Sequence, residues 1–127
     1  MEQKIRVRRH KKTDRLYVDL NGFLNVDDLN LFKDKMTRAL EKVIPPFGMI
    51  ANQKTLQPIG GDAHRIAIEV MKMVSEKGCK KVVRIVGENA LLKLRQDEVD
   101  QNEDFNYEVI HATSIKMAEH ILEKEGL

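Results

Sequence analysis

The chain has 127 residues, the length of one ordinary domain, so we expect a single domain spanning residues 1–127. Hydrophobic residues make up 42% and charged residues 33%, which allows a core and a polar surface and excludes wholesale disorder. The formal net charge of +2 is too small to require a polyanionic partner. The single cysteine, Cys79, excludes an internal disulfide and a thiolate-rich zinc site.

The sequence also predicts a cytoplasmic protein that is not embedded in a membrane. Its first residues lack the apolar region of a secretory leader. No apolar run approaches the ~20 residues that are needed to span a bilayer.

The first third of the chain predicts two strands and a helix. Lys4–Arg9 and Leu16–Leu20 alternate apolar with polar residues, the period of half-exposed strands joined in a hairpin. Asn25 is the expected helix N-cap, and Pro45-Pro46 ends the helix. Its apolar stripe comprises Leu29, Phe32, Met36, Leu40 and Val43.

The middle of the chain predicts a buried strand followed by a second helix. Phe47–Ala51 is the strand, and a polar, turn-rich stretch follows it. Asp62 is the expected N-cap of the helix, and Gly78 is its expected left-handed C-cap. Its inward residues are Ile66, Val70, Met73 and Val74, and Ala63 and Ala67 allow close approach.

The last third predicts two more strands and two more helices. Lys81–Val86 is the best central strand, and Ala90–Val99 supplies a short helix before the acidic loop Asp97–Asp104. Tyr107–His111 is the last strand. Thr113 or Ser114 caps a terminal helix whose inward residues are Ile115, Ala118, Ile121 and Leu122.

The resulting order, β-β-α-β-α-β-α-β-α, predicts an α/β domain. Strands that alternate with helices imply crossover connections and a mostly parallel sheet, to which the opening hairpin adds an antiparallel strand. We therefore expect a mixed, mostly parallel five-stranded sheet with about four helices. The basic first strand fits an edge, where positive charge discourages pairing with other chains.

This order of elements resembles the STAS domain, the fold of bacterial anti-sigma factor antagonists of the SpoIIAA type, from Ile5 to the terminal helix. In that family the third strand leads into an Asp-Ser-Ser-Gly-like loop, in which a partner kinase phosphorylates a hydroxyl residue. The corresponding segment here is Gln57–His64, in which Gly60 and Gly61 stand where the hydroxyl residues would stand. The resemblance thus implies a binding module without that phosphorylation switch.

The loop before the second helix is the main candidate site. The resemblance implies that it contacts a protein, with Ile59 as an exposed apolar anchor. Its candidate partner-binding residues are Gln57, Ile59, Gly60, Gly61, Asp62, His64 and Arg65. Thr55 is a possible phosphoacceptor. The glycines before a helix start also fit an anion site or a plain turn, and Asp62 as N-cap argues against an anion.

Other features carry weaker functional hypotheses. Residues 1–15 have a local net charge of +5. The strand residues Lys4, Arg6, Arg8 and Arg9 fit a solvated edge or, less well, a contact with nucleic acid or anionic lipid. Cys79 follows a helix C-terminus, where the dipole opposes a thiolate, so we interpret it as structural. The four histidines have no metal-ligand spacing, and neither a metal nor a cofactor is expected.

The sequence therefore favours a non-enzymatic regulatory or scaffold protein that acts by protein–protein contact. A kinase-like or sigma-regulatory protein is the partner class that the resemblance implies, and a homodimer is a further possibility. The alternative is a small-molecule or lipid binding module, with a pocket lined by Met and Leu between the sheet and a helix, as in lipid-carrier domains of related fold. No nucleophile, carboxylate pair or metal motif indicates an enzyme.

Overall fold

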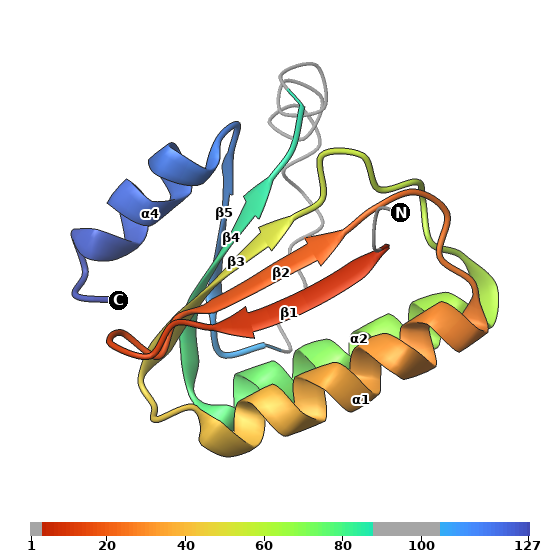
Figure 1. Cartoon of the computed structure of the whole chain (residues 1–127), viewed down its shortest axis with the longest axis horizontal. Coiled ribbons are helices and arrows are strands. Elements are labelled where there is room, and N and C mark those ends of the chain that lie inside the picture. Colours follow the sequence, from red (N-terminus) through yellow and green to blue (C-terminus); the bar gives the residue numbers. More distant parts are fainter. Residues whose placement is uncertain (1–3, 88–104) are drawn as a thin grey trace.

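A five-stranded mixed sheet forms the centre of the computed structural model, which describes residues 4–87 and 105–127 (Figure 1). The strands are β1 (Ile5–Arg9), β2 (Leu16–Leu20), β3 (Phe47–Asn52), β4 (Cys79–Ile85) and β5 (Glu108–Ala112). They lie side by side in chain order, with β1 antiparallel to β2 and the other neighbours parallel. The predicted sheet is confirmed, and the basic strand β1 is at its edge.

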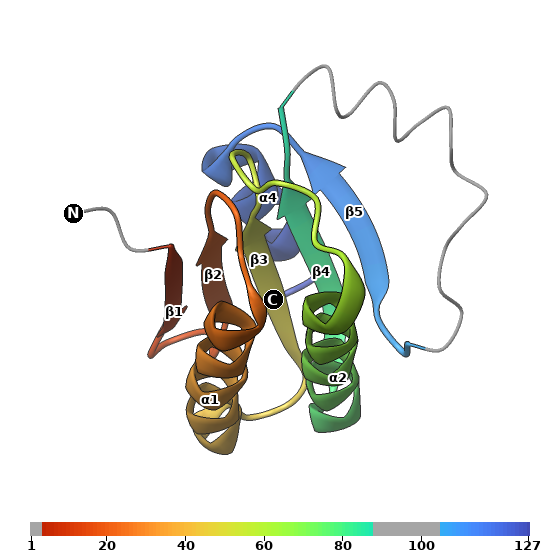
Figure 2. The same ribbon diagram turned by 90° about the vertical axis from the view of Figure 1, so that its right-hand side faces the viewer.

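Helices cover both faces of the sheet. Helices α1 (Val26–Lys42) and α2 (Gly61–Lys77) lie on one face, and α4 (Ile115–Glu123) lies on the other (Figure 2). The described residues thus hold three helices. The predicted helix at 90–99 and the acidic loop at 97–104 lie outside the described residues.

The main core lies between the sheet and helices α1 and α2. Alternate strand residues point into it because successive side chains of a strand face opposite sides of the sheet. The strand residues of this core include Leu16, Val18, Leu20, Phe47, Met49, Ala51 and Val82. All five residues of the predicted α1 stripe are buried, as are Ala63, Val70 and Val74 of α2, whereas Ile66 and Met73 are half-buried.

A smaller core lies under α4. Ala118 and Leu122 of α4 pack on Ile50 and Val83 of the sheet. Helix α4 lies close to β3 at Gly48, where a Cβ would come within 2.9 Å of a Leu122 methyl carbon. Ile115 was expected to face inward, but it lies in the first turn of α4 and is 44% exposed.

The helix ends show where local sequence was interpreted correctly. Asn25 caps α1 in a reciprocal arrangement with Asp28, and Ser114 caps α4. Gly78 adopts the predicted left-handed conformation after α2, with φ of 109°. The prediction of Asp62 as N-cap is wrong, because α2 begins at Gly61 and its N-cap, two residues before Asp62, is Gly60, which offers no side-chain acceptor.

Candidate functional site

Two loops meet beyond the carboxyl ends of β2 and β3. The backbone N–H of Gly22 donates to the Thr55 carbonyl (3.1 Å), and the Gln57 N–H donates to the Gly22 carbonyl (3.0 Å). A β-bridge between Gly22 and Leu56 lies at the same point. The loop that precedes α2 is therefore attached to the loop that precedes α1 through its backbone.

The predicted partner-binding residues lie in this region, and most are exposed. The exposed residues are Gln57, Gly60, Gly61, Asp62, His64 and Arg65. The Arg65 guanidinium lies 3.9 Å from the Asp62 carboxylate in the first turn of α2, where both side chains are largely solvated. A loose pair of this kind contributes little to stability and leaves both groups free to contact a partner.

The expectation that Ile59 is an exposed anchor is wrong. Ile59 is half-buried and packs against the main core. The loop turns this side chain inward because an isoleucine beside the apolar ends of the sheet loses water contact by doing so. Replacing Ile59 with a charged residue would therefore disturb the core as well as the surface.

Thr55, the possible phosphoacceptor, lies at the junction of the two loops. Its side chain is exposed, and its Oγ1 donates to the Asn21 Oδ1 at 2.7 Å. Its hydroxyl thus contributes to holding the loops together.

Phe23 is an exposed apolar residue beside this junction that sequence reasoning missed. It is 65% exposed, whereas its neighbour Leu24 is buried. Val26, at the start of α1, is 40% exposed. The sequence could have indicated this exposure, because Phe23 lies between an Asn-Gly turn and a helix N-cap. At that position it belongs to no strand or helix pattern that would place it in the core.

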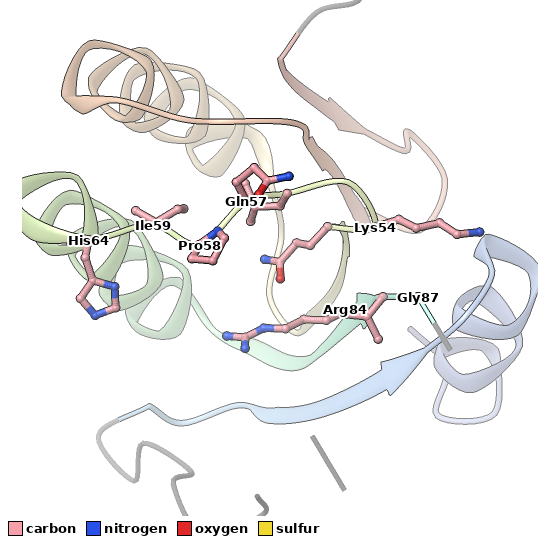
Figure 3. Close-up of a pocket in the computed structure, with 10 residues that line it drawn as sticks. Lys54, Gln57, Pro58, Ile59, His64, Arg84 and Gly87 are labelled. Atoms are coloured by element: carbon pink, nitrogen blue, oxygen red, sulfur yellow. The ribbon is translucent and has the colours of Figure 1, made fainter. Parts of the chain in front are cut away.

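A pocket of about 460 Å³ opens at the same end of the sheet. The loop after β3 forms one wall, and Arg84 of β4 with Val86 and Gly87 after the strand forms the other. Figure 3 shows Arg84 extending from β4 toward the side where His64 lies, while the amino group of Lys54 points away from Arg84 at the far rim. Residues lining the pocket include Lys54, Gln57, Ile59, His64, Arg84 and Gly87.

Arg84 is a partly buried cation that sequence reasoning missed. It occupies the strand position two residues after the core residue Val82, so it faces the side of α1 and α2, and it pairs in register with His111 of β5. The Nε of Arg84 is buried and has no hydrogen-bond partner in the described part of the chain. The same holds for Nε2 of His111 and for the hydroxyl of Tyr107.

The charge of Arg84 acts on these two neighbours. Burial, with the positive charge of Arg84 added, lowers the pKa of His111 below its ordinary 6.5. Burial raises the pKa of Tyr107 to about 12, although Arg84 works in the opposite direction. At neutral pH the group formed by Arg84, His111 and Tyr107 therefore holds one cation and two neutral polar side chains.

The remaining candidates lie away from this region. Cys79 is buried, and burial raises its pKa to about 12, so it is not a thiolate at neutral pH. Within residues 4–87 and 105–127, no group of three His, Cys, Asp or Glu side chains is arranged to hold a metal ion. No helix among these residues is long and apolar enough to cross a bilayer.

The basic residues of β1 do not form one continuous surface. Arg6 and Arg8 occupy alternate positions from Arg9, so they face the opposite side of the sheet. Arg9 pairs with Asp14 at 2.9 Å, and Arg8 lies 5.4 Å from the centre of the Tyr17 ring. Lys4 lies within 3.5 Å of Asp28. The contact with nucleic acid or anionic lipid stays a prediction.

Comparison with known proteins supports the fold. No protein-family model matches the chain, and no curated protein matches it in sequence. The solved structure of the Bacillus cell fate determinant SpoIIAA in the phosphorylated form is similar to this chain, with a TM-score of 0.58 and 12% sequence identity. The match covers 92% of this chain and 98% of that chain. At this identity the likeness shows the fold alone, and the predicted STAS-like, SpoIIAA-like fold is confirmed.

Proposed function

We propose that this protein is a non-enzymatic regulatory or scaffold module that contacts a protein partner at one end of its sheet. The contact surface comprises residues 21–26 and 53–65, that is, the two joined loops, the first residue of α1 and the first turn of α2. The observation that carries this proposal is the exposure of Phe23 beside a loop junction that backbone hydrogen bonds hold in place.

This surface costs little conformational entropy to order on binding. An aromatic side chain brings a large apolar area, and aromatic residues often dominate the binding energy of interfaces. Because Gly22, Thr55 and Gln57 already bond the loops to each other, binding does not have to order them from a free chain. Exposed polar residues of the same surface, among them His64 and Arg65, supply a polar rim.

The likeness to a cell fate determinant supports a regulatory role, and a kinase-like or sigma-regulatory protein is the partner class we propose. That determinant is known in a phosphorylated form. In this chain Gly60 and Gly61 stand where the resemblance to the family implies hydroxyl residues. We infer that partner choice here is not switched by phosphorylation at those positions. Partner concentration or a small ligand would set the occupancy instead.

The test is capture of the partner by matched surface variants. Phe23→Ser removes the proposed anchor, and Ile44→Ser is its control, because Ile44 is 69% exposed and follows the opposite end of α1. The partner captured by the wild-type chain is identified by mass spectrometry, purified and titrated against both variants. We expect Phe23→Ser to weaken binding about tenfold or more and Ile44→Ser to leave it unchanged.

Equal binding by the wild-type chain and Phe23→Ser would overturn the contact surface. Loss of binding in Ile44→Ser alone would place the interface at the other end of the molecule. Both substitutions remove exposed apolar area, so neither is expected to unfold the domain.

A second candidate function, ligand binding, is favoured by the pocket beside Arg84. Its lining includes charged and amide side chains, unlike the Met- and Leu-lined cavity that the sequence predicted for a lipid. The pocket therefore favours a polar ligand over a lipid chain.

A further inference from the structure

Two buried cations and one half-buried cation of this fold differ in one respect. Arg15 and Lys81 are 5% and 6% exposed, and each has hydrogen-bond acceptors within reach. The Arg15 guanidinium donates to the backbone oxygen of Leu127 at 2.6 and 3.1 Å, and Lys81 donates to Glu125 at 2.6 Å. Arg84, by contrast, makes no hydrogen bond or ion pair with any residue that the structure describes.

A cation that is partly removed from water without an acceptor is destabilising, because it loses hydration and gains nothing in return. A side chain in this state is typical of a site whose acceptor comes from a ligand. The orphaned Nε belongs to a guanidinium, whose planar set of donors matches the oxygens of a phosphate or carboxylate.

The surroundings of Arg84 fit an anion. Among the described residues, no Asp or Glu lines the pocket, whereas Arg84 and His64 do; Lys54 lies at the rim with its amino group pointing away from Arg84. Gln53 and Gln57 add amide N–H groups, and His111 lies beside Arg84 on β5. The pocket lies at the carboxyl ends of parallel strands, where ligands of open α/β sheets bind.

Asp62 does not block an anion at the start of α2. Asp62 was expected to cap α2 and to repel an anion there, but its side chain is 80% exposed and pairs loosely with Arg65. The N-cap of α2 is Gly60, which leaves the first N–H groups of the helix without a side-chain acceptor. Their positive end adds to the field near His64 in the first turn.

We propose that this pocket binds the phosphate group of a small phosphorylated molecule, with Arg84 as the residue that pairs with the phosphate oxygens. A volume of about 460 Å³ is within the range of small-molecule sites. His64 and the glutamine amides would donate further hydrogen bonds to the phosphate. The rest of the ligand would contact the wall formed by Pro58 and Ile59. This inference goes beyond the protein-contact proposal, which rests on Phe23.

The experiment is a titration of the ¹⁵N-labelled protein with inorganic phosphate, followed by NMR at constant ionic strength and neutral pH. We expect saturable shifts at Arg84, Gly87 and His111, with millimolar affinity. Arg84→Gln should weaken this binding about tenfold or more, because it removes the charge and the paired donors. Arg6→Gln, on the exposed edge strand, is the matched control and should bind like the wild-type chain.

Two further arms identify the ligand class and guard against misfolding. Glycerol 3-phosphate should bind at least as tightly as inorganic phosphate, and succinate, a dicarboxylate, should bind more weakly than either. Arg84→Lys keeps the charge but loses the paired donors, so it should bind with intermediate affinity. The dispersion of each NMR spectrum reports whether the variant is folded.

Several results would overturn the proposal. The first is the absence of saturable shifts up to about 50 mM phosphate, a concentration beyond the useful range of a specific site. The second is equal phosphate binding by the wild-type chain and Arg84→Gln. The third is a set of shifts confined to residues 4–9. Rejection of glycerol 3-phosphate with retention of inorganic phosphate would overturn the ligand class. None of these measurements uses a protein partner, so failure here is distinct from failure of the contact surface.

Discussion

Cations that are withdrawn from water near the central strands have different partners on the two faces of the sheet. On the face covered by α4, Lys81 reaches Glu125 and Glu108, and Arg15 reaches the backbone of Leu127 and the hydroxyl of Tyr17. On the face covered by α1 and α2, Arg84 has no acceptor among the described residues.

This difference separates a structural role from a binding role. The partnered cations hold the C-terminal residues against the sheet, so their contribution is to stability. Arg84 lies only three positions after Lys81, but the alternation of strand side chains places it on the opposite face, at the mouth of a pocket. We infer that the first group is selected for the fold and the second for a ligand.

The largest effect is expected for Arg15→Met. This change removes two hydrogen bonds to the Leu127 backbone oxygen and one to Tyr17, and it leaves a buried acceptor unsatisfied. We expect the free energy of unfolding to fall by about 2–3 kcal/mol, measured by urea denaturation. A loss smaller than that of the exposed control Arg6→Met would contradict the structural role of Arg15.

A smaller loss is expected for Lys81→Met. Burial disfavours the charged form of Lys81, but Glu125 and Glu108 outweigh it and raise its pKa. Both partner carboxylates are largely exposed, so solvent screens the pairs and the expected destabilisation is about 1 kcal/mol. Lys80→Met, on the exposed side of the same strand, should change stability by less than about 0.5 kcal/mol, and equal losses would show that the pairs do not matter.

Arg84→Met sharpens the contrast, because it should not destabilise the protein. Removing a cation that has no acceptor also removes its desolvation cost, so stability should stay constant or rise by up to about 1 kcal/mol. The same urea experiment measures it. A loss comparable with that of Arg15→Met would mean that Arg84 is a structural cation.

The smallest effect is the pH dependence of His111. Burial and the charge of Arg84 lower its pKa, so the folded protein binds fewer protons there than the unfolded chain. Stability from this residue is present above pH 6.5 and is lost as the pH falls through the lower, folded pKa. In Arg84→Met the pKa of His111, measured by NMR titration, should rise toward its ordinary value. An unchanged pKa would show that the charge of Arg84 does not act on His111.

Most of the fold was predictable because each element has its own periodic pattern. The alternation in Leu16–Leu20 and the stripe from Leu29 to Val43 specify a strand and a helix without reference to the rest of the chain. Asn25 and Gly78 marked helix ends through their side-chain and backbone chemistry. The prediction for Asp62 failed because glycine is also accepted as an N-cap, and Gly60 lies two residues before Asp62.

The candidate site was only partly predictable, since it depends on contacts between distant segments. The loop before α2 was identified, but its attachment to Gly22 and the inward turn of Ile59 follow from tertiary packing. Arg84 was interpreted as one more residue of a strand. The sequence nevertheless indicated that Arg84 is unusual. A charged residue between Val83 and Ile85 in a central strand has no solvated face of the sheet to occupy.

The central claim is that the joined loops at the carboxyl ends of β2 and β3 are the protein's contact surface. The most direct test is hydrogen–deuterium exchange of the purified protein with and without its captured partner. We predict slowed exchange in residues 21–26 and 53–65 and unchanged exchange in β1 and α4. Protection confined to β1 or α4, with the loops unchanged, would contradict the account.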